Sequence, residues 1–197
     1  MSSYIQHNFS LPKLTGISEK TNEEHLKLYA GYVKNTNEIL GSIKDLSIDP
    51  AKNAYVLGEL SRRFAFEFNG MKNHEYYFHS FEGGHTEPNI ESNLYKAIVQ
   101  TWGSFDAWME SFILLAKTRG VGWAILYYDK DTNQLLNTWV DEQHLGHLNS
   151  CQYIVGIDMW EHAFVADYQP SGKADYIKDY FANLNWNHPE SLFEKSL

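Results

Sequence analysis

The chain has 197 residues, of which 43% are apolar and 15% aromatic, so it can bury a sizeable core and is not disordered. Its formal charge of −9 argues against nucleic acid or an anionic membrane as the main partner. No stretch approaches the roughly 18 apolar residues of a membrane span, and the start lacks the pattern of a secretory signal. Cys151 is the only cysteine, which excludes an internal disulfide framework and suits a reducing compartment. We therefore expect a soluble cytoplasmic protein.

The N-terminal part predicts two long helices joined by a short connection. The first begins near residues 18–21, because residues 21–24 (Thr-x-x-Glu) offer a capping box, and it ends at Gly41. Asp49-Pro50 then supplies an N-cap with proline at the first helical position, and apolar residues at helical spacing continue to about Tyr77. Two such helices predict an antiparallel helical hairpin.

A cluster of turn-forming residues, Gly83-Gly84-His-Thr-Glu-Pro88, is the clearest boundary signal in the chain. No internal repeats or low-complexity tracts interrupt the sequence on either side. We therefore expect two domains, an N-terminal helical hairpin domain at residues 1–84 and a C-terminal domain at residues 85–197.

Three further helices are expected in the C-terminal domain. Residues 90–100 and 105–118 have a helical pattern, with Ser104 as the cap of the second helix and Gly120 closing it. The last helix carries the apolar residues of segment 176–184.

Between these helices the apolar residues change to the pattern of a sheet. Residues 122–128 form a buried-strand run, residues 129–133 a turn, and residues 134–140 the returning partner of a hairpin. Residues 153–157 are apolar and β-branched and predict a third strand. The sequence thus predicts an α+β fold, in which an N-terminal antiparallel helical hairpin packs on a domain with a three-stranded antiparallel sheet flanked by helices.

Histidine and aspartate residues at four positions are candidates for metal ligands. Asp158 and His162 lie four residues apart in G-I-D-M-W-E-H-A-F, so on a helical turn they face the same way, although this spacing alone is more typical of surface or capping residues. His25 lies in the first predicted helix, seven residues before Tyr32 on the same face; its simplest interpretation is a solvent-facing histidine. His74 lies in an aromatic stretch and is either a buried core residue or a ligand.

The segment D-x-W-E-H-A-[YF] resembles the ligand segment of the iron/manganese superoxide dismutases. That family has a histidine in its first helix, an Asn-His pair late in its second helix, and the Asp and His of D-x-W-E-H. This chain supplies His25, His74, Asp158 and His162 in the same order. The similarity extends to residues 102–108, 120–124 and 183–186 and covers nearly the whole chain. The resemblance implies that these four side chains bind one metal ion.

The resemblance also implies an activity, the conversion of superoxide to dioxygen and hydrogen peroxide with one manganese or iron ion per subunit. Three neutral imidazoles and one carboxylate suit these metals. Gly70 is the small residue expected of manganese-type members, and Gln143 matches their donor to the metal-bound solvent. His144 is adjacent and also capable of that role. Manganese is slightly favoured, and both metals and both candidate donors stay open.

Four more residues resemble functional positions of the family. Tyr32 resembles the gateway tyrosine, a candidate for substrate access and proton delivery. Trp123 and Trp160 resemble the aromatic walls of the site, and plain core packing is compatible with that role. Glu161 resembles the glutamate that reaches the ligand histidine of the partner subunit, which implies a homodimer and leaves a tetramer open. An ordinary surface glutamate is the alternative.

The first helix departs from the family pattern. The interval from His25 to Tyr32 is one residue shorter than the usual H-x₇-Y, which removes about 100° of helical rotation. An ungapped match would place Glu24 at the ligand position. We prefer His25 because imidazole is the ligand type that the family uses there.

Two residues that form a hydrogen-bonded pair in the family are both replaced in this chain. The family's usual active-site histidine is absent, with Leu28 and Tyr29 in that place, and the tyrosine that pairs with it is replaced by Val165. We therefore expect a different proton route. Lys173 occupies a position where the family often has arginine, so a local basic patch is expected to attract the anionic substrate despite the acidic net charge.

Two alternatives belong to other functional classes. A non-catalytic structural or interaction protein of the same fold would predict the loss of ligands, whereas all four are present. A zinc-dependent hydrolase would use a metal without a redox cycle, and the chain has no H-E-x-x-H motif.

Overall fold

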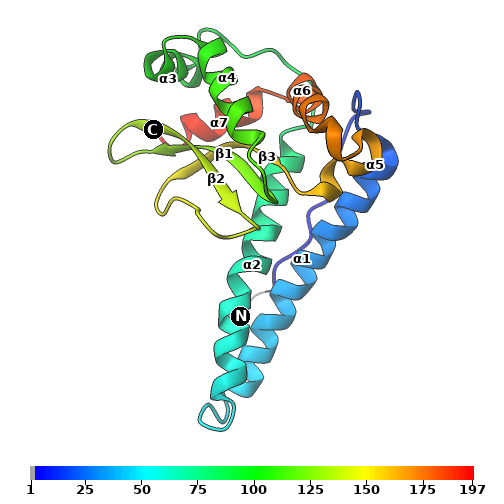
Figure 1. The fold of residues 1–197 in the computed structure, drawn as a ribbon. Coiled ribbons are helices and arrows are strands. Elements are labelled where there is room, and N and C mark those ends of the chain that lie inside the picture. Colours follow the sequence, from blue (N-terminus) through cyan, green and yellow to red (C-terminus); the bar gives the residue numbers. More distant parts are fainter. Residues whose placement is uncertain (1–2) are drawn as a thin grey trace.

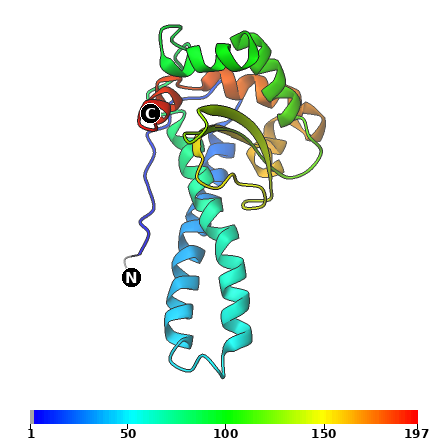
Figure 2. The same ribbon diagram turned by 90° about the vertical axis from the view of Figure 1, so that its left-hand side faces the viewer.

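The computed structural model describes residues 3–197 and has the predicted α+β fold. Helices α1 (Glu19–Leu46) and α2 (Ala54–His79) form a long antiparallel pair, and Figures 1 and 2 show this hairpin extending well beyond the sheet and the shorter helices. The expected helical hairpin is thus present. The division into domains at residues 1–84 and 85–197 stays a prediction.

Helix α1 begins where it was expected, but the end of α1 and the start of α2 differ from the prediction. Ser18 caps α1, since its hydroxyl accepts a hydrogen bond from the Thr21 backbone N–H at 3.1 Å. The helix continues through Gly41 because one glycine costs a helix only about 1 kcal/mol. Asp49-Pro50 lies in the connection, and Asn53 precedes α2, its side-chain amide donating across the connection to the Leu46 carbonyl at 3.0 Å.

Two short helices follow, α3 (Asn93–Trp102) and α4 (Phe105–Ala116). Gly103 adopts a left-handed conformation (φ 85°) between them, and Ser104 caps α4 as predicted. Gly120 does not close α4, which ends four residues earlier at Ala116.

The sheet has three antiparallel strands in the order β2-β1-β3: β1 (Gly122–Asp129), β2 (Gln134–Asp141) and β3 (Gln152–Asp158). The predicted hairpin between the first two strands is present. Near the start of the central strand β1, Trp123 pairs with Asp158, the last residue of β3. This register places an aromatic wall residue beside a predicted metal ligand.

After the sheet the chain forms a series of short helical segments. The predicted last helix corresponds to α6 (Lys173–Asn183), and a further helix, α7 (Asn187–Glu194), was missed. The remaining segments are η1 (Glu161–Ala163), α5 (Val165–Tyr168) and η2 (Pro170–Gly172).

The core is rich in buried aromatic residues and joins the hairpin to the sheet. Helix α2 lies against β3, where Tyr76 and Tyr153 stack with ring centroids 4.2 Å apart. Segment η1 contacts α1. The described helices include none with the length and apolarity needed to cross a bilayer. The packing brings α1, α2, β3 and η1 to one place.

Candidate metal centre

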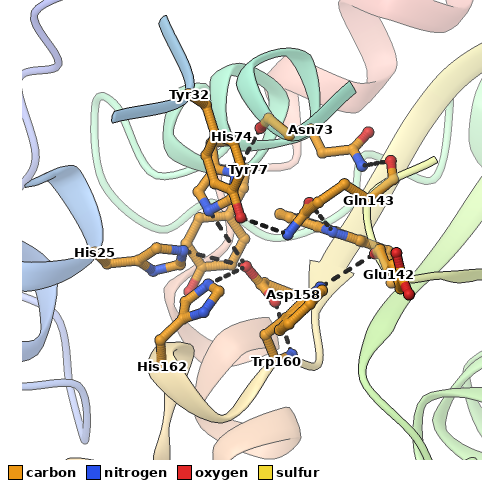
Figure 3. Close-up of polar contacts among 12 residues, drawn as sticks. His25, Tyr32, Asn73, His74, Tyr77, Glu142, Gln143, Asp158, Trp160 and His162 are labelled. Carbon is orange, nitrogen blue, oxygen red and sulfur yellow. Dashed lines mark hydrogen bonds and ion pairs between the residues drawn. The ribbon is translucent and has the colours of Figure 1, made fainter. Parts of the chain in front are cut away.

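Each of the four predicted ligands comes from a different element. His25 lies on α1, His74 on α2, Asp158 at the end of β3 and His162 in η1. One donor atom from each lies within 4.8 Å of the others, and Figure 3 shows the three imidazoles arranged around the Asp158 carboxylate. The Nε2 atoms of His162, His25 and His74 lie 3.1, 3.2 and 3.6 Å from Asp158 Oδ2. The donors therefore face a common point.

From their spacing we had expected Asp158 and His162 to share a helical turn. They do not. Asp158 is the last residue of a strand, and His162 lies in a 3₁₀ helix. The chain turns at Trp160, whose backbone N–H donates to Asp158 Oδ1 at 2.8 Å. This bond occupies one carboxylate oxygen and leaves Oδ2 facing the imidazoles.

The two hairpin histidines are held with Nε2 toward the cluster. His74 Nδ1 donates to the Gly70 carbonyl at 2.6 Å, and its Nε2 is buried without a hydrogen-bond partner in the described chain. His25 is only 1% exposed, so the solvent-facing interpretation is wrong. The competing Glu24 is exposed and pairs with Lys27 at 2.7 Å.

Burial sets the charge of the cluster. It lowers the pKa of His25, and it lowers the pKa of His74 to about 3, helped by the neighbouring His25. Burial alone would raise the pKa of Asp158, but the charge and hydrogen bonds of His162 and His25 outweigh it and lower that pKa. At neutral pH the buried members are thus neutral imidazoles and an ionised carboxylate, the protonation states that metal ligands require. An unpartnered His74 Nε2 within this donor set fits a manganese or iron ion.

Gln143 lies beside the cluster and is completely buried. Its Oε1 accepts from Trp123 Nε1 at 2.8 Å, and its Nε2 donates to the Tyr32 hydroxyl at 3.0 Å. Figure 3 shows Gln143 and Tyr32 next to Asp158. His144 lies elsewhere, with its ring against Phe66 and its Nδ1 4.0 Å from Glu142. Of the two candidate donors, the structure brings Gln143 to Tyr32.

Comparison with known proteins agrees with this site. The family model for the C-terminal domain of iron/manganese superoxide dismutases matches residues 90–192. A protein of Cupriavidus metallidurans named superoxide dismutase [Fe] is 31% identical over 185 residues, covering 92% of this chain and 90% of that protein. One of Mycobacterium leprae named superoxide dismutase [Mn] is 32% identical over 180 residues, covering 90% and 84%. The chain belongs to the iron/manganese superoxide dismutase family. Its relatives carry the names of both metals, so membership does not select one.

Other residues assigned from the family lie around the cluster. The Trp160 ring stacks on His162 with centroids 5.9 Å apart, and its Nε1 donates to the Glu142 carbonyl at 3.1 Å. Glu161 is exposed in the single chain, and His162, with a side chain 21% exposed, is the most accessible of the four. Lys173 donates to the Thr118 carbonyl at 2.8 Å, and its Nζ lies 5.6 Å from the Trp139 ring centroid.

Sequence reasoning missed two residues that contact Gln143. Asn73 and His147 both donate to its backbone carbonyl, at 3.1 and 3.0 Å. The only signal in the sequence was their position, one residue before His74 and four residues after Gln143.

Proposed function

We propose that this family member is a superoxide dismutase that uses one manganese or iron ion held by His25, His74, Asp158 and His162. The observation that carries the proposal is the convergence of three imidazole nitrogens on Asp158 Oδ2, with His74 Nε2 buried and unpartnered. When bound, the ion supplies one-electron oxidation and reduction. The overall reaction consumes two superoxide anions and two protons and yields one O₂ and one H₂O₂.

The protein keeps the four donors ready for the ion and excludes water from three of them. His25, His74 and Asp158 are each at most 1% exposed, and the Trp123 and Trp160 rings lie beside His74 and His162. Such fixed, buried donors need no rearrangement when charge moves during the reaction.

Tyr32, oriented by Gln143, would relay protons from solvent to the reduced product, its own proton being replaced from solvent. Gln143 Nε2–H donates to Tyr32, which leaves the hydroxyl proton of Tyr32 free of any partner in the described chain. Burial raises the pKa of Tyr32, so the phenol keeps this proton at neutral pH. This route does not need the active-site histidine of the family or the tyrosine that pairs with it, both of which this chain lacks.

Two finer assignments belong to the same proposal. Manganese is favoured over iron, because Gly70 and Gln143 are the manganese-type combination. We also propose a homodimer, in which Glu161 contacts the ligand histidine of the partner subunit, with further pairing into a tetramer left to measurement. The exposure of Glu161 beside His162 is compatible with such a contact. The cytoplasmic location stays a prediction.

The test is to load the full-length protein separately with manganese and with iron, and to measure metal content and superoxide consumption on the same samples. We expect about one equivalent of ion per subunit and dismutation with at least one of the metals. His74→Ala should lose most of the metal, whereas His85→Ala, which changes a histidine outside the cluster, should keep it.

The outcome also separates the other functional classes. A non-catalytic protein of this fold would show no dismutation with either metal, and a zinc hydrolase would retain zinc in preference to both. Retention of a full equivalent by His74→Ala would contradict the assigned ligand set.

A further inference from the structure

The backbone carbonyl of Gln143 is fixed by two side chains, one from α2 and one from later in the same loop between β2 and β3. Asn73 Nδ2, from α2, donates to this oxygen at 3.1 Å, and His147 Nε2 donates to it at 3.0 Å. A carbonyl oxygen has two lone pairs, so both are occupied. The preceding residue, Glu142, has a left-handed backbone (φ 51°), a conformation that is rare for a residue with a side chain. The loop thus depends on contacts that hold it in place.

The same contacts determine the tautomer of His147. A carbonyl only accepts hydrogen bonds, so Nε2 carries a proton, and in the neutral ring Nδ1 is then an acceptor. The hydroxyl of Tyr127, on β1, hydrogen-bonds Nδ1 and therefore donates to it. Burial lowers the pKa of His147, which agrees with a neutral ring. The hydrogen bonds run in one direction, from Tyr127 to His147 and from His147 to Gln143.

We propose that His147, oriented by Tyr127, is a positioning residue that sets where the Gln143 side chain meets Tyr32 and Trp123. Gln143 is then held at both ends, by His147 and Asn73 at its carbonyl and by Trp123 and Tyr32 at its amide. His147 cannot transfer a proton through these hydrogen bonds to Gln143, because a backbone carbonyl carries no proton that it could pass on. Its effect on the reaction is therefore through position alone.

His147 can be changed without touching the metal ligands. It lies with Asn73, Tyr127 and Cys151 in the lining of a surface groove that includes none of the four ligands. The contact itself is independent of the proposed activity, whereas its value for turnover rests on the proposed dismutase function. Two separate measurements can therefore be made on the same variants.

The variants are His147→Leu, which removes the donor, and His147→Gln, whose side-chain amide can replace Nε2–H. Tyr127→Phe removes only the hydroxyl that orients His147. It provides a second test of the proposal if His147→Leu does not fold. Tyr128→Phe is the matched control, since this neighbouring hydroxyl donates to Asn133 instead. The first measurement is the side-chain amide ¹⁵N–¹H resonance of Gln143 in the full-length zinc-loaded protein, zinc being diamagnetic. The second is the dismutation rate of the manganese-loaded protein.

We expect His147→Leu and Tyr127→Phe to shift the Gln143 amide resonances, and His147→Gln and Tyr128→Phe to leave them in place. The dismutation rate should fall about tenfold in His147→Leu and recover in His147→Gln. In a Gln143→Ala background, His147→Leu should have no further effect on the rate.

Gln143 resonances that stay unchanged in His147→Leu would overturn the proposal, even if that variant were less stable, because a purely structural role moves stability alone. A rate loss that persists in the Gln143→Ala background would overturn it as well. If the wild-type protein lacked dismutation, the proposed function would fail while the amide resonances still decided the contact.

Discussion

Gly70 lies directly against the ring of Tyr32: a Cβ atom at position 70 would stand 2.5 Å from Tyr32 Cδ1. The same glycine accepts the hydrogen bond from His74 Nδ1 through its carbonyl. One residue of α2 thus makes room for the tyrosine beside the cluster and orients one predicted ligand. A larger side chain at this position would have to displace Tyr32.

Gly70→Ala should therefore disturb the site, and Gly58→Ala is its control on the same helix. Nothing lies within 4 Å of a Cβ at position 58, so that variant gains the helix preference of alanine, about 1 kcal/mol. Gly70→Ala gains the same preference but forces the Tyr32 ring to move. We expect it to be less stable than Gly58→Ala by about 1–3 kcal/mol in urea unfolding, and slower in dismutation. Equal stability of the two variants would contradict the close packing.

Tyr32→Phe should separate proton supply from metal binding. The variant removes the acceptor of Gln143 Nε2 and leaves a buried N–H unpaired, which costs about 1–3 kcal/mol of unfolding free energy. The ligands are untouched, so the metal content should equal that of the wild type while the dismutation rate falls. Tyr55→Phe, on an exposed tyrosine of α2, should change neither quantity. Loss of metal from Tyr32→Phe would show that the tyrosine supports the ligands instead.

His188 should make stability depend on pH. The ring stacks on His79, and burial, with the nearby His79 and Lys195, lowers the pKa of His188 to about 4. Between pH 6.5 and 4 the unfolded chain therefore binds a proton at His188 that the folded chain does not. The stability that neutral His188 contributes is present above pH 6.5 and is lost as the pH falls toward 4.

The comparison is urea unfolding of the metal-free wild type and His188→Gln at pH 7.5 and 4.5. From pH 7.5 to 4.5 the unfolding free energy of the wild type should fall by about 1–2 kcal/mol more than that of the variant. This value is reduced because the ring is partly exposed. An identical pH dependence in both proteins would show that the pKa of His188 is the same in the folded and unfolded states.

Glu161→Ala should weaken the proposed homodimer. If Glu161 contacts the partner subunit's His162, its removal leaves that histidine without a charged partner, and the dimer dissociation constant should rise about tenfold or more. Glu59→Ala removes an exposed glutamate that pairs with Arg62 within α2 and serves as the control. Sedimentation velocity over a dilution series measures both. A wild type that sediments as a monomer, or an unchanged constant in Glu161→Ala, would contradict the proposed contact.

The order of the elements was largely predictable because the spacing of apolar residues and the turn-forming residues are local signals. The hairpin, the three strands and the helix capped by Ser104 were predicted in this way. Helix ends were less accurate: α1 runs through Gly41, since a glycine lowers helix stability without having to end the helix, and α4 ends four residues before Gly120. The short helix α7 was missed altogether.

By itself the sequence determined which residue types were available for metal binding and, through their order, the family they resemble. Only the tertiary structure showed which of two adjacent candidate residues faces the cluster. His25 and Glu24 differ by about 100° on the helix, and it is the packing of α1 against α2 and η1 that buries the first and exposes the second. Likewise, it is Gln143, and not the adjacent His144, whose side chain hydrogen-bonds Trp123 and Tyr32. The orientation of a side chain depends on contacts between distant segments, which spacing along the chain does not contain.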